Sequence, residues 1–459
     1  MALSDQLYFS RDTKLYIELF DPATGAVDTD ATKWEIPILD GFSFSQSTNT
    51  SEVTLSEASL GGVSRRGRRV FTDNFAPAEF SFSTYVRPIV SANGTTGGWE
   101  GSGSEDRHHA IEEVLWAMFT GDSTFTKTNG ATESVWSDSI ANTTSNMVVD
   151  FSASNKAQLN KANLYFVMGG DQSADVVQNG GTGGSSNTTV TLGSTTGIVA
   201  GDVLRWTGGS YAMDSNQQIV VQSVDSSTEI TVSPAAVISG GTDITFSQKQ
   251  VYKLTGAVLN ECSIDFDLEG IATLNWSGMA ETISEELTAP AATIYEGITG
   301  TSSFIRNKIS TLSLTSGANA TPASQAYSIT LTGGNITMTN NISFLTPEEI
   351  GVVNKAIGHV TGTRSITGSF TCYLNTAGNG SADLFEDLMS ATTVVTHEFN
   401  AVANIGGTTG PCVAFSMPQC HVSLPAINVE DVVSVEVTFD ALPSAIPNTD
   451  ELTITYKGA

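Results

Sequence analysis

Residues 39–49 read Leu-Asp-Gly-Phe-Ser-Phe-Ser-Gln-Ser-Thr-Asn, and residues 331–341 read Leu-Thr-Gly-Gly-Asn-Ile-Thr-Met-Thr-Asn-Asn. In both stretches polar and apolar residues alternate, which is the pattern of a β-strand with one buried face and one wet face. The two stretches also match position by position. This match indicates that one strand of the fold occurs twice in the chain, as an internal repeat.

Further blocks repeat in the same order along the chain. Residues 81–86 match 369–374, residues 111–115 match 384–388, residues 262–264 match 420–422, and residues 269–274 match 430–435. Each match is weak alone, but chance rarely produces a shared order, so we predict a duplicated fold. Strand patterns dominate both copies. We expect only two convincing helices, at 108–119 and 381–389, because apolar residues recur there at a spacing of three to four.

The repeats predict a mainly β fold made of two tandem copies of one β-domain, each with one helix. The first domain is expected to comprise residues 1–170 and 249–290, and the second to comprise residues 291–459. Residues 171–248 have no counterpart in the second copy and contain Gly-rich runs near both ends. We therefore expect them to form a small β-domain inserted into a surface loop, where insertions have a modest entropic cost.

Composition limits the classes of function. The 459 residues are 40% hydrophobic and only 15% charged, and the formal net charge is −28. Tight binding of duplex DNA or of an anionic membrane normally requires clustered Lys and Arg, so the acidic balance argues against both ligands. Low charge with abundant Thr and Val favours strands and turns over helices.

Nothing in the sequence predicts catalysis or a bound cofactor. The four cysteines have no zinc-site spacing, and we interpret them as buried thiols in a reduced compartment. Residues 265–276 begin like a calcium loop, but Trp276 stands where the chelating Glu would be. No secretory signal pattern opens the chain, and no apolar run reaches the roughly 20 residues that span a bilayer. We expect a protein that is not an enzyme, holds no cofactor or metal and does not insert into membranes.

One basic cluster stands out in this acidic chain. It consists of Arg65, Arg66, Arg68 and Arg69. The favoured interpretation is a contact with carboxylates of a neighbouring subunit, since guanidinium groups pair well with them. A solvated loop and a nucleic-acid contact remain as alternatives.

Several of these blocks resemble the major tail tube protein of T-five-type siphophages. In the first half they are residues 46–58, 65–73 and 78–88, and in the second half residues 333–347 and 366–375. The likeness runs through both halves in order and fails over 171–248. The C-terminal immunoglobulin-like domain of that family is also not matched.

The resemblance implies tail-tube-type β-sandwich domains and a structural role. Three chains, hence six half-units, would close into a ring, and stacked rings would form a hollow tube in the virion tail, assembled in the host cytoplasm. Tape-measure protein and then DNA would pass through it without specific binding. Further partners would be other copies of the chain, the tail terminator and the tail-tip or baseplate proteins.

A lumen-facing strand is the second candidate site. Asp265, Asp267 and Glu269 alternate, so we expect them to share one strand face. This face is a candidate lining of the channel, where negative charge repels phosphates. An ordinary solvent-facing strand is the stronger alternative.

Two other functions fit parts of the sequence. A secreted bacterial β-sandwich surface protein or adhesin would share the low charge, but it needs an export signal and leaves the ordered repeats unexplained. The tube of a contractile tail would share the fold.

Overall fold

The computed structural model describes residues 8–20, 33–54, 68–91, 107–121, 140–151, 159–169, 176–179, 183–206, 219–238, 243–286, 294–295, 304–318, 320, 322–346, 355–390, 398–429, 432–446 and 448–458. Within these residues β-strands predominate and two α-helices occur, so the expected mainly β fold is confirmed. Internal contacts separate the chain into two compact units. The first comprises residues 1–16, 165–253 and 284–291, and the second comprises residues 17–164, 254–283 and 292–459.

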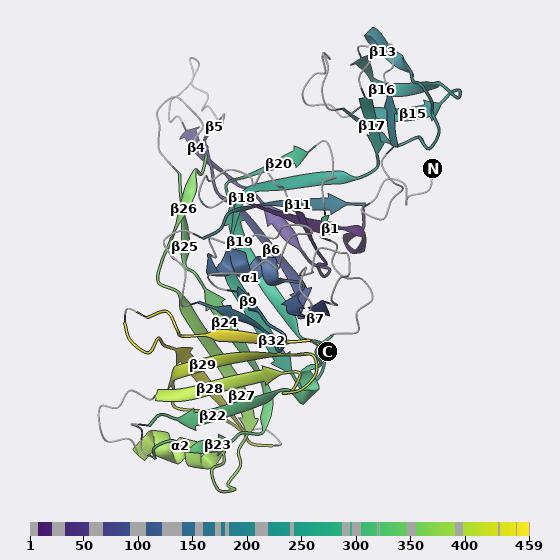
Figure 1. The fold of residues 1–459 in the computed structure, drawn as a ribbon. Coiled ribbons are helices and arrows are strands. Elements are labelled where there is room, and N and C mark those ends of the chain that lie inside the picture. The colour runs from purple at the N-terminus through teal and green to yellow at the C-terminus, as the bar shows by residue number, and fades with distance from the viewer. Residues whose placement is uncertain are drawn as a thin grey trace. The chain divides into compact units, whose positions relative to one another are not determined.

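The second unit contains eight antiparallel strands that follow one another side by side, here called the eight-strand sheet. In spatial order they are β3 (Ser43–Ser45), β6 (Ala78–Tyr85), β19 (Thr273–Ala280), β18 (Gln250–Asp267, through residues 258–267), β24 (Leu331–Thr339), β27 (Ser365–Tyr373), β31 (Ser434–Ala441) and β30 (Ala426–Asn428). The contact of β18 with β24, here called the internal seam, joins the two halves of the chain in one sheet (Figure 1).

The two four-strand segments on either side of the internal seam have corresponding registers. Ser43 of β3 lies opposite Ser81 of β6, and Asn335 of β24 lies opposite Ser369 of β27. The repeat in the sequence aligns these same residues, Ser43 with Asn335 and Ser81 with Ser369. Strand order and register are therefore alike in both segments, while the duplication itself stays a prediction.

A glycine and a phenylalanine face each other at corresponding points of the two segments. Phe80 of β6 pairs with Gly278 of β19 in the first segment, whereas Gly368 of β27 pairs with Phe439 of β31 in the second. A Cβ atom on either glycine would collide with the facing ring. Each pair combines one glycine with one phenylalanine, but the phenylalanine lies on β6 in the first segment and on β31 in the second. The two pairs therefore fill the same total volume, as close packing of a core requires.

A second sheet in this unit combines strands from both halves of the chain. In spatial order its strands are β23 (Ala326–Ser328), β22 (Thr311–Ser316), β28 (Glu398–Ile405), β29 (Cys412–Val422), β32 (Thr453–Lys457), β10 (Met147–Asp150) and β9 (Ile140–Asn142). The end of β29 also pairs with β31 and so passes into the eight-strand sheet. Because β9 and β10 precede residue 170, strand pairing crosses the predicted boundary between the two β-sandwich domains.

The remaining strands form shorter pairings. Strand β1 (Lys14–Leu19) pairs with β2 (Lys33–Ile36) and β11 (Ala162–Met168), β18 pairs with β20 (Thr282–Glu286), and β2 pairs in parallel with β21 (Ile294–Tyr295). Two-stranded sheets are formed by β4 (Thr48–Thr54) with β5 (Arg68–Phe75), β7 (Pro88–Ser91) with β8 (Arg107–Ala110), and β25 (Ile342–Leu345) with β26 (Gly358–Thr361).

The first helix begins later than predicted. Helix α1 spans Glu113–Thr120, whereas the sequence predicted a helix over 108–119. His108 and His109 lie in β8, so their interpretation as a helix start is wrong. Apolar spacing predicts the helix but does not exclude a strand just before it, where backbone groups find partners in β7 instead. All eight residues of α1 are buried.

The second predicted helix is confirmed. Helix α2 spans Ser381–Ser390, and Leu384 and Leu388 are buried on one face. The Ser381 hydroxyl accepts a hydrogen bond from the Asn375 backbone N–H at 2.8 Å and donates one to the Tyr373 carbonyl at 2.8 Å. Ser381 therefore fixes the loop that leads into α2.

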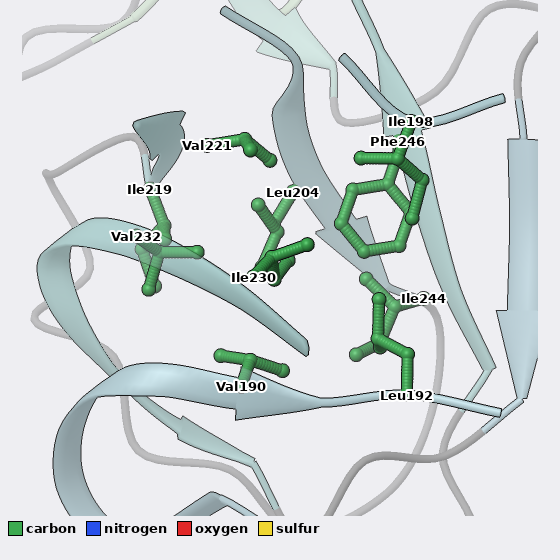
Figure 2. Packing of buried hydrophobic residues seen from close by; sticks show 10 residues of the cluster. All are labelled: Val190, Leu192, Ile198, Leu204, Ile219, Val221, Ile230, Val232, Ile244 and Phe246. Atoms are coloured by element: carbon green, nitrogen blue, oxygen red, sulfur yellow. The ribbon is translucent and has the colours of Figure 1, made fainter. Parts of the chain in front are cut away.

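The first unit contains a six-stranded antiparallel sheet with a core of its own. Its order is β12 (Val176–Asn179), β17 (Asp243–Ser247), β14 (Val203–Trp206), β15 (Val220–Val224), β16 (Glu229–Ile238) and β13 (Gly183–Thr191). Figure 2 shows ten buried side chains from these strands and their loops: Val190, Leu192, Ile198, Leu204, Ile219, Val221, Ile230, Val232, Ile244 and Phe246. This sheet falls within the interval 171–248.

Candidate functional site

The eight-strand sheet has one apolar face and one polar face. The burial of β6 and β31 alternates along each strand, with Phe82 and Val437 inside and Ser83 and Glu436 outside. Facing residues of antiparallel neighbours lie on the same side, so the registers extend this division across all eight strands. The outer side is here called the polar face, and its Ser, Thr, Asn, Asp and Glu members are Ser43, Ser45, Glu79, Ser81, Ser83, Glu261, Ser263, Asp265, Asp267, Thr273, Asn275, Ser277, Asn335, Thr337, Thr339, Ser365, Thr367, Ser369, Thr371, Asn428, Ser434, Glu436, Thr438 and Asp440.

Rows of polar side chains run across the internal seam without a break. One such row passes from Ser83 through Asn275, Ser263 and Thr337 to Thr367. Ser83 Oγ donates a hydrogen bond to Asn275 Oδ1 at 2.7 Å. The polar face therefore belongs to both halves of the chain at once and is ordered by cross-strand hydrogen bonds.

The polar face is acidic. Its carboxylates are Glu79, Glu261, Asp265, Asp267, Glu436 and Asp440. The strand segments that build it, with β18 counted from residue 258, contain no Lys or Arg. Partial burial and the neighbouring Asp267 carboxylate raise the pKa of Asp265 above its ordinary value. The electrostatic field of the polar face repels other anions, and the hydroxyl groups between the acids remain hydrated.

The structure brings two of the three predicted lumen acids together. Asp265 and Asp267 are exposed on the polar face of β18, opposite Asn335 and Gly333 of β24. Strand β18 ends at Asp267, and Glu269 lies in the turn that follows, so the expectation that all three share one strand face is wrong for Glu269. The alternation was extended past the strand end, where Gly270 has a φ of 103° and reverses the chain.

Four acids of this face were missed by sequence reasoning. Glu79, Glu261, Glu436 and Asp440 come from β6, β18 and β31. Each occupies an outward position in an alternating strand, which was the available signal. Their gathering on one surface depends on strand register, and a single strand does not reveal register.

The basic cluster falls partly outside the described residues. Arg65 and Arg66 lie there, while Arg68 and Arg69 begin β5 and face Thr54 and Val53 of β4. The Arg69 side chain is exposed at this end of the hairpin. The predicted contact with a neighbouring subunit stays a prediction.

A buried polar cluster surrounds the start of α1. Burial raises the pKa of Glu112 to about 7. His109 Nδ1 lies 3.1 Å from Glu113 Oε2. Trp116 Nε1 donates a hydrogen bond at 2.7 Å to the hydroxyl of Tyr456, a residue of the C-terminal strand β32. The Trp116–Tyr456 hydrogen bond joins α1, from the first half of the chain, to β32 in the second half.

The cysteines are isolated buried thiols. Cys262, Cys372, Cys412 and Cys420 are all free. Burial raises the pKa of Cys372 to about 11 and that of Cys420 to about 12. Among the described residues, no group of three or more His, Cys, Asp and Glu is arranged to hold a metal ion. No helix within the described ranges has the length and hydropathy needed to span a bilayer.

Comparison with known proteins identifies a relative of this chain. No protein-family model matches the chain. The chain is 24% identical over 456 residues to the tail tube protein pb6 of Escherichia phage T5, and the alignment covers 97% of this chain and 75% of pb6. The resemblance to T-five-type tail tube proteins is thus confirmed over nearly the whole chain, and with it a structural role in the tail tube of a phage virion.

Proposed function

We propose that this chain builds a hollow tube from stacked rings of three chains, with the polar face lining the channel through which tape-measure protein and then DNA pass. The observation that carries the proposal is the continuous acidic, hydroxyl-rich face shared by both halves of the chain. A wall of this kind repels phosphates and offers no cation for them to pair with, so DNA slides along it.

The corresponding halves support a ring of six half-units. Strand order and register agree on both sides of the internal seam, and the Phe80–Gly278 pair has a volume-matched counterpart in Gly368–Phe439. We therefore take the two halves as copies of one tube-building domain, residues 1–170 with 249–290 and residues 291–459. Three such chains supply six half-units, and a head-to-tail contact between chains closes them into a ring.

The other assignments follow from this arrangement. A channel must stay clear, so we place the predicted inserted domain, residues 171–248, on the outside of the tube. The cluster at Arg65, Arg66, Arg68 and Arg69 would meet carboxylates of a neighbouring chain. The tail terminator and the tail-tip or baseplate proteins would close the ends of the tube.

Negative-stain microscopy of the purified protein tests the tube directly, since tubes with a central channel are expected. Cysteine labelling then tests which surface faces the channel. In assembled tubes, Asp265→Cys on the polar face should react with a small maleimide but not with one attached to a protein-sized polymer. Asp225→Cys, in the loop between β15 and β16, should react with both reagents.

Three outcomes would contradict parts of the proposal. Equal reaction of Asp265→Cys with both reagents would remove the polar face from the channel. Protein that stays monomeric at every concentration would count against the tube itself. Protection of Asp225→Cys from the large reagent would refute only the exterior placement of residues 171–248.

A further inference from the structure

A lysine, a glutamate and an asparagine from three strands meet in the second unit. Lys33 Nζ lies 3.1 Å from Glu18 Oε1, and Asn163 Nδ2 donates a hydrogen bond to Glu18 Oε2 at 2.9 Å. Glu18 belongs to β1, which pairs with β2 and with β11, the strands of Lys33 and Asn163. One carboxylate therefore holds an amine and an amide at the same place.

The three side chains are shielded from solvent. Glu18 is 5% exposed, Asn163 is 1% exposed, and the Lys33 side chain is 15% exposed. Keeping an ammonium and a carboxylate away from water is expensive, which lowers the cost of moving a proton between them so that both become neutral. A neutral Lys33 amine is a nucleophile, because its lone pair is free to form a bond.

The asparagine amide is the electrophile of this group. Asn163 Oδ1 is buried and has no hydrogen-bond partner in the part of the chain that the structure describes. An ionised Glu18 only accepts hydrogen bonds, so it cannot supply one to this oxygen. A protonated Glu18 can donate one once the amide turns by half a rotation, and this bond would draw electrons away from the amide carbon. Proton transfer from Lys33 to Glu18 therefore activates both reacting groups.

We propose that Lys33 and Asn163 join in an intramolecular isopeptide bond, with Glu18 as the general acid and base. Glu18 takes one proton from the Lys33 ammonium and keeps it. Lys33 Nζ then attacks Asn163 Cγ, and the bond between Cγ and Nδ2 breaks. Nζ loses a second proton, which Glu18 relays to Nδ2, so ammonia leaves. The product is a neutral amide beside a protonated Glu18, and the reaction consumes no oxidant or cofactor.

The strand spacing suits this bond. Lys33 and Asn163 both reach the Glu18 carboxylate, so β1 lies between β2 and β11, whose backbones are then about 9.6 Å apart. A lysine side chain, the new bond and an asparagine side chain together span about 10 Å when extended. The crosslink would therefore bridge β1 without moving either strand. It would also close a long loop of the first half, which stabilises the fold by restricting the unfolded chain.

Another buried lysine–glutamate pair lacks the third member and supplies a control. Lys161 Nζ lies 2.7 Å from Glu281 Oε1. No side-chain amide among the described residues donates a hydrogen bond to the Glu281 carboxylate. Lys161 therefore has a proton acceptor but no electrophile beside it, and we expect it to stay a free amine.

Intact-mass spectrometry of the denatured full-length chain tests the bond. We expect a mass about 17 Da below that of the sequence, calculated with or without Met1, which is the loss of one ammonia. Trypsin should yield a branched peptide in which residues 15–65 are joined to residues 162–205, because an amidated Lys33 is no longer cleaved. A chain of full mass, or a free peptide ending at Lys33, would overturn the inference.

Three variants separate the bond from a simple ion pair. Lys33→Arg keeps a positive charge beside Glu18 but forms no such amide, so it should have the full mass. Glu18→Gln removes the proton acceptor and should also have the full mass. Lys161→Arg should still lose about 17 Da. Loss of ammonia from Lys33→Arg would place the reaction elsewhere and overturn the inference, and a crosslink in Glu18→Gln would overturn the role of Glu18. The measurement needs no assembled tube, so its outcome is independent of the proposed function.

Discussion

The buried carboxyl of Glu112 makes stability depend on pH in a predictable direction. Its side chain is 1% exposed, and burial raises its pKa from 4.5 to about 7. Between these values the folded chain holds a proton that the unfolded chain releases. Stability therefore falls as pH rises from about 4.5 to about 7 and stays low above that range. A difference of about 2.5 pKa units corresponds to about 3 kcal/mol.

Glu112→Gln removes this dependence because the amide stays neutral. The variant should match the wild type near pH 4.5 and exceed its free energy of unfolding by up to about 3 kcal/mol at pH 8. Urea unfolding of dissociated chains at both pH values, followed by tryptophan fluorescence, measures the difference. Titration of other groups cancels when wild type and variant are subtracted.

The control for this experiment is Glu269→Gln, at an exposed acid in the turn after β18. It should leave the pH profile of unfolding unchanged. The reasoning is refuted if Glu112→Gln has the pH profile of the wild type, or if it is the less stable protein at pH 8.

Two further substitutions probe the packing of the second unit. Gly368→Ala should lower the unfolding free energy in urea titration by about 1–3 kcal/mol, because the added Cβ meets the Phe439 ring. Gly378→Ala, where the added Cβ has no atom within 4 Å, should lower it far less. Equal losses in the two variants would refute the packing argument. Arg364→Met should lower the unfolding free energy by about 3–5 kcal/mol, since Arg364 Nε lies 2.6 Å from the buried Glu451 carboxylate, which would lose its partner. Adding Glu451→Gln to this variant should recover part of the loss in the same titration. An unchanged loss in the double variant would contradict the pairing.

Sequence patterns predicted where the strands of this protein lie better than they predicted which strands pair with each other. Alternation located β3, β6 and β31, since burial of every second residue needs only local information. Helix α2 was found from one apolar face. The predicted start of α1 was wrong because hydrophobic spacing does not specify backbone partners, and residues 107–110 pair with β7.

The candidate site was predicted only in part for a similar reason. Asp265 and Asp267 were identified because they alternate within one strand. Glu79 and Asp440 lie on the same face, yet they are separated from β18 by other strands and by long stretches of chain. A surface assembled from register across eight strands is a non-local property. A single sequence therefore shows its pieces without showing that they meet.

The exchange of glycine and phenylalanine between the two halves restricts how the chain can evolve. Each half keeps its own matched pair, Phe80 with Gly278 and Gly368 with Phe439. Copying only β27 into the place of β6 would set glycine against glycine and leave a hole. Copying only β31 into the place of β19 would force two rings into one space. A strand of one segment therefore fits the corresponding place in the other segment only when its facing strand moves with it.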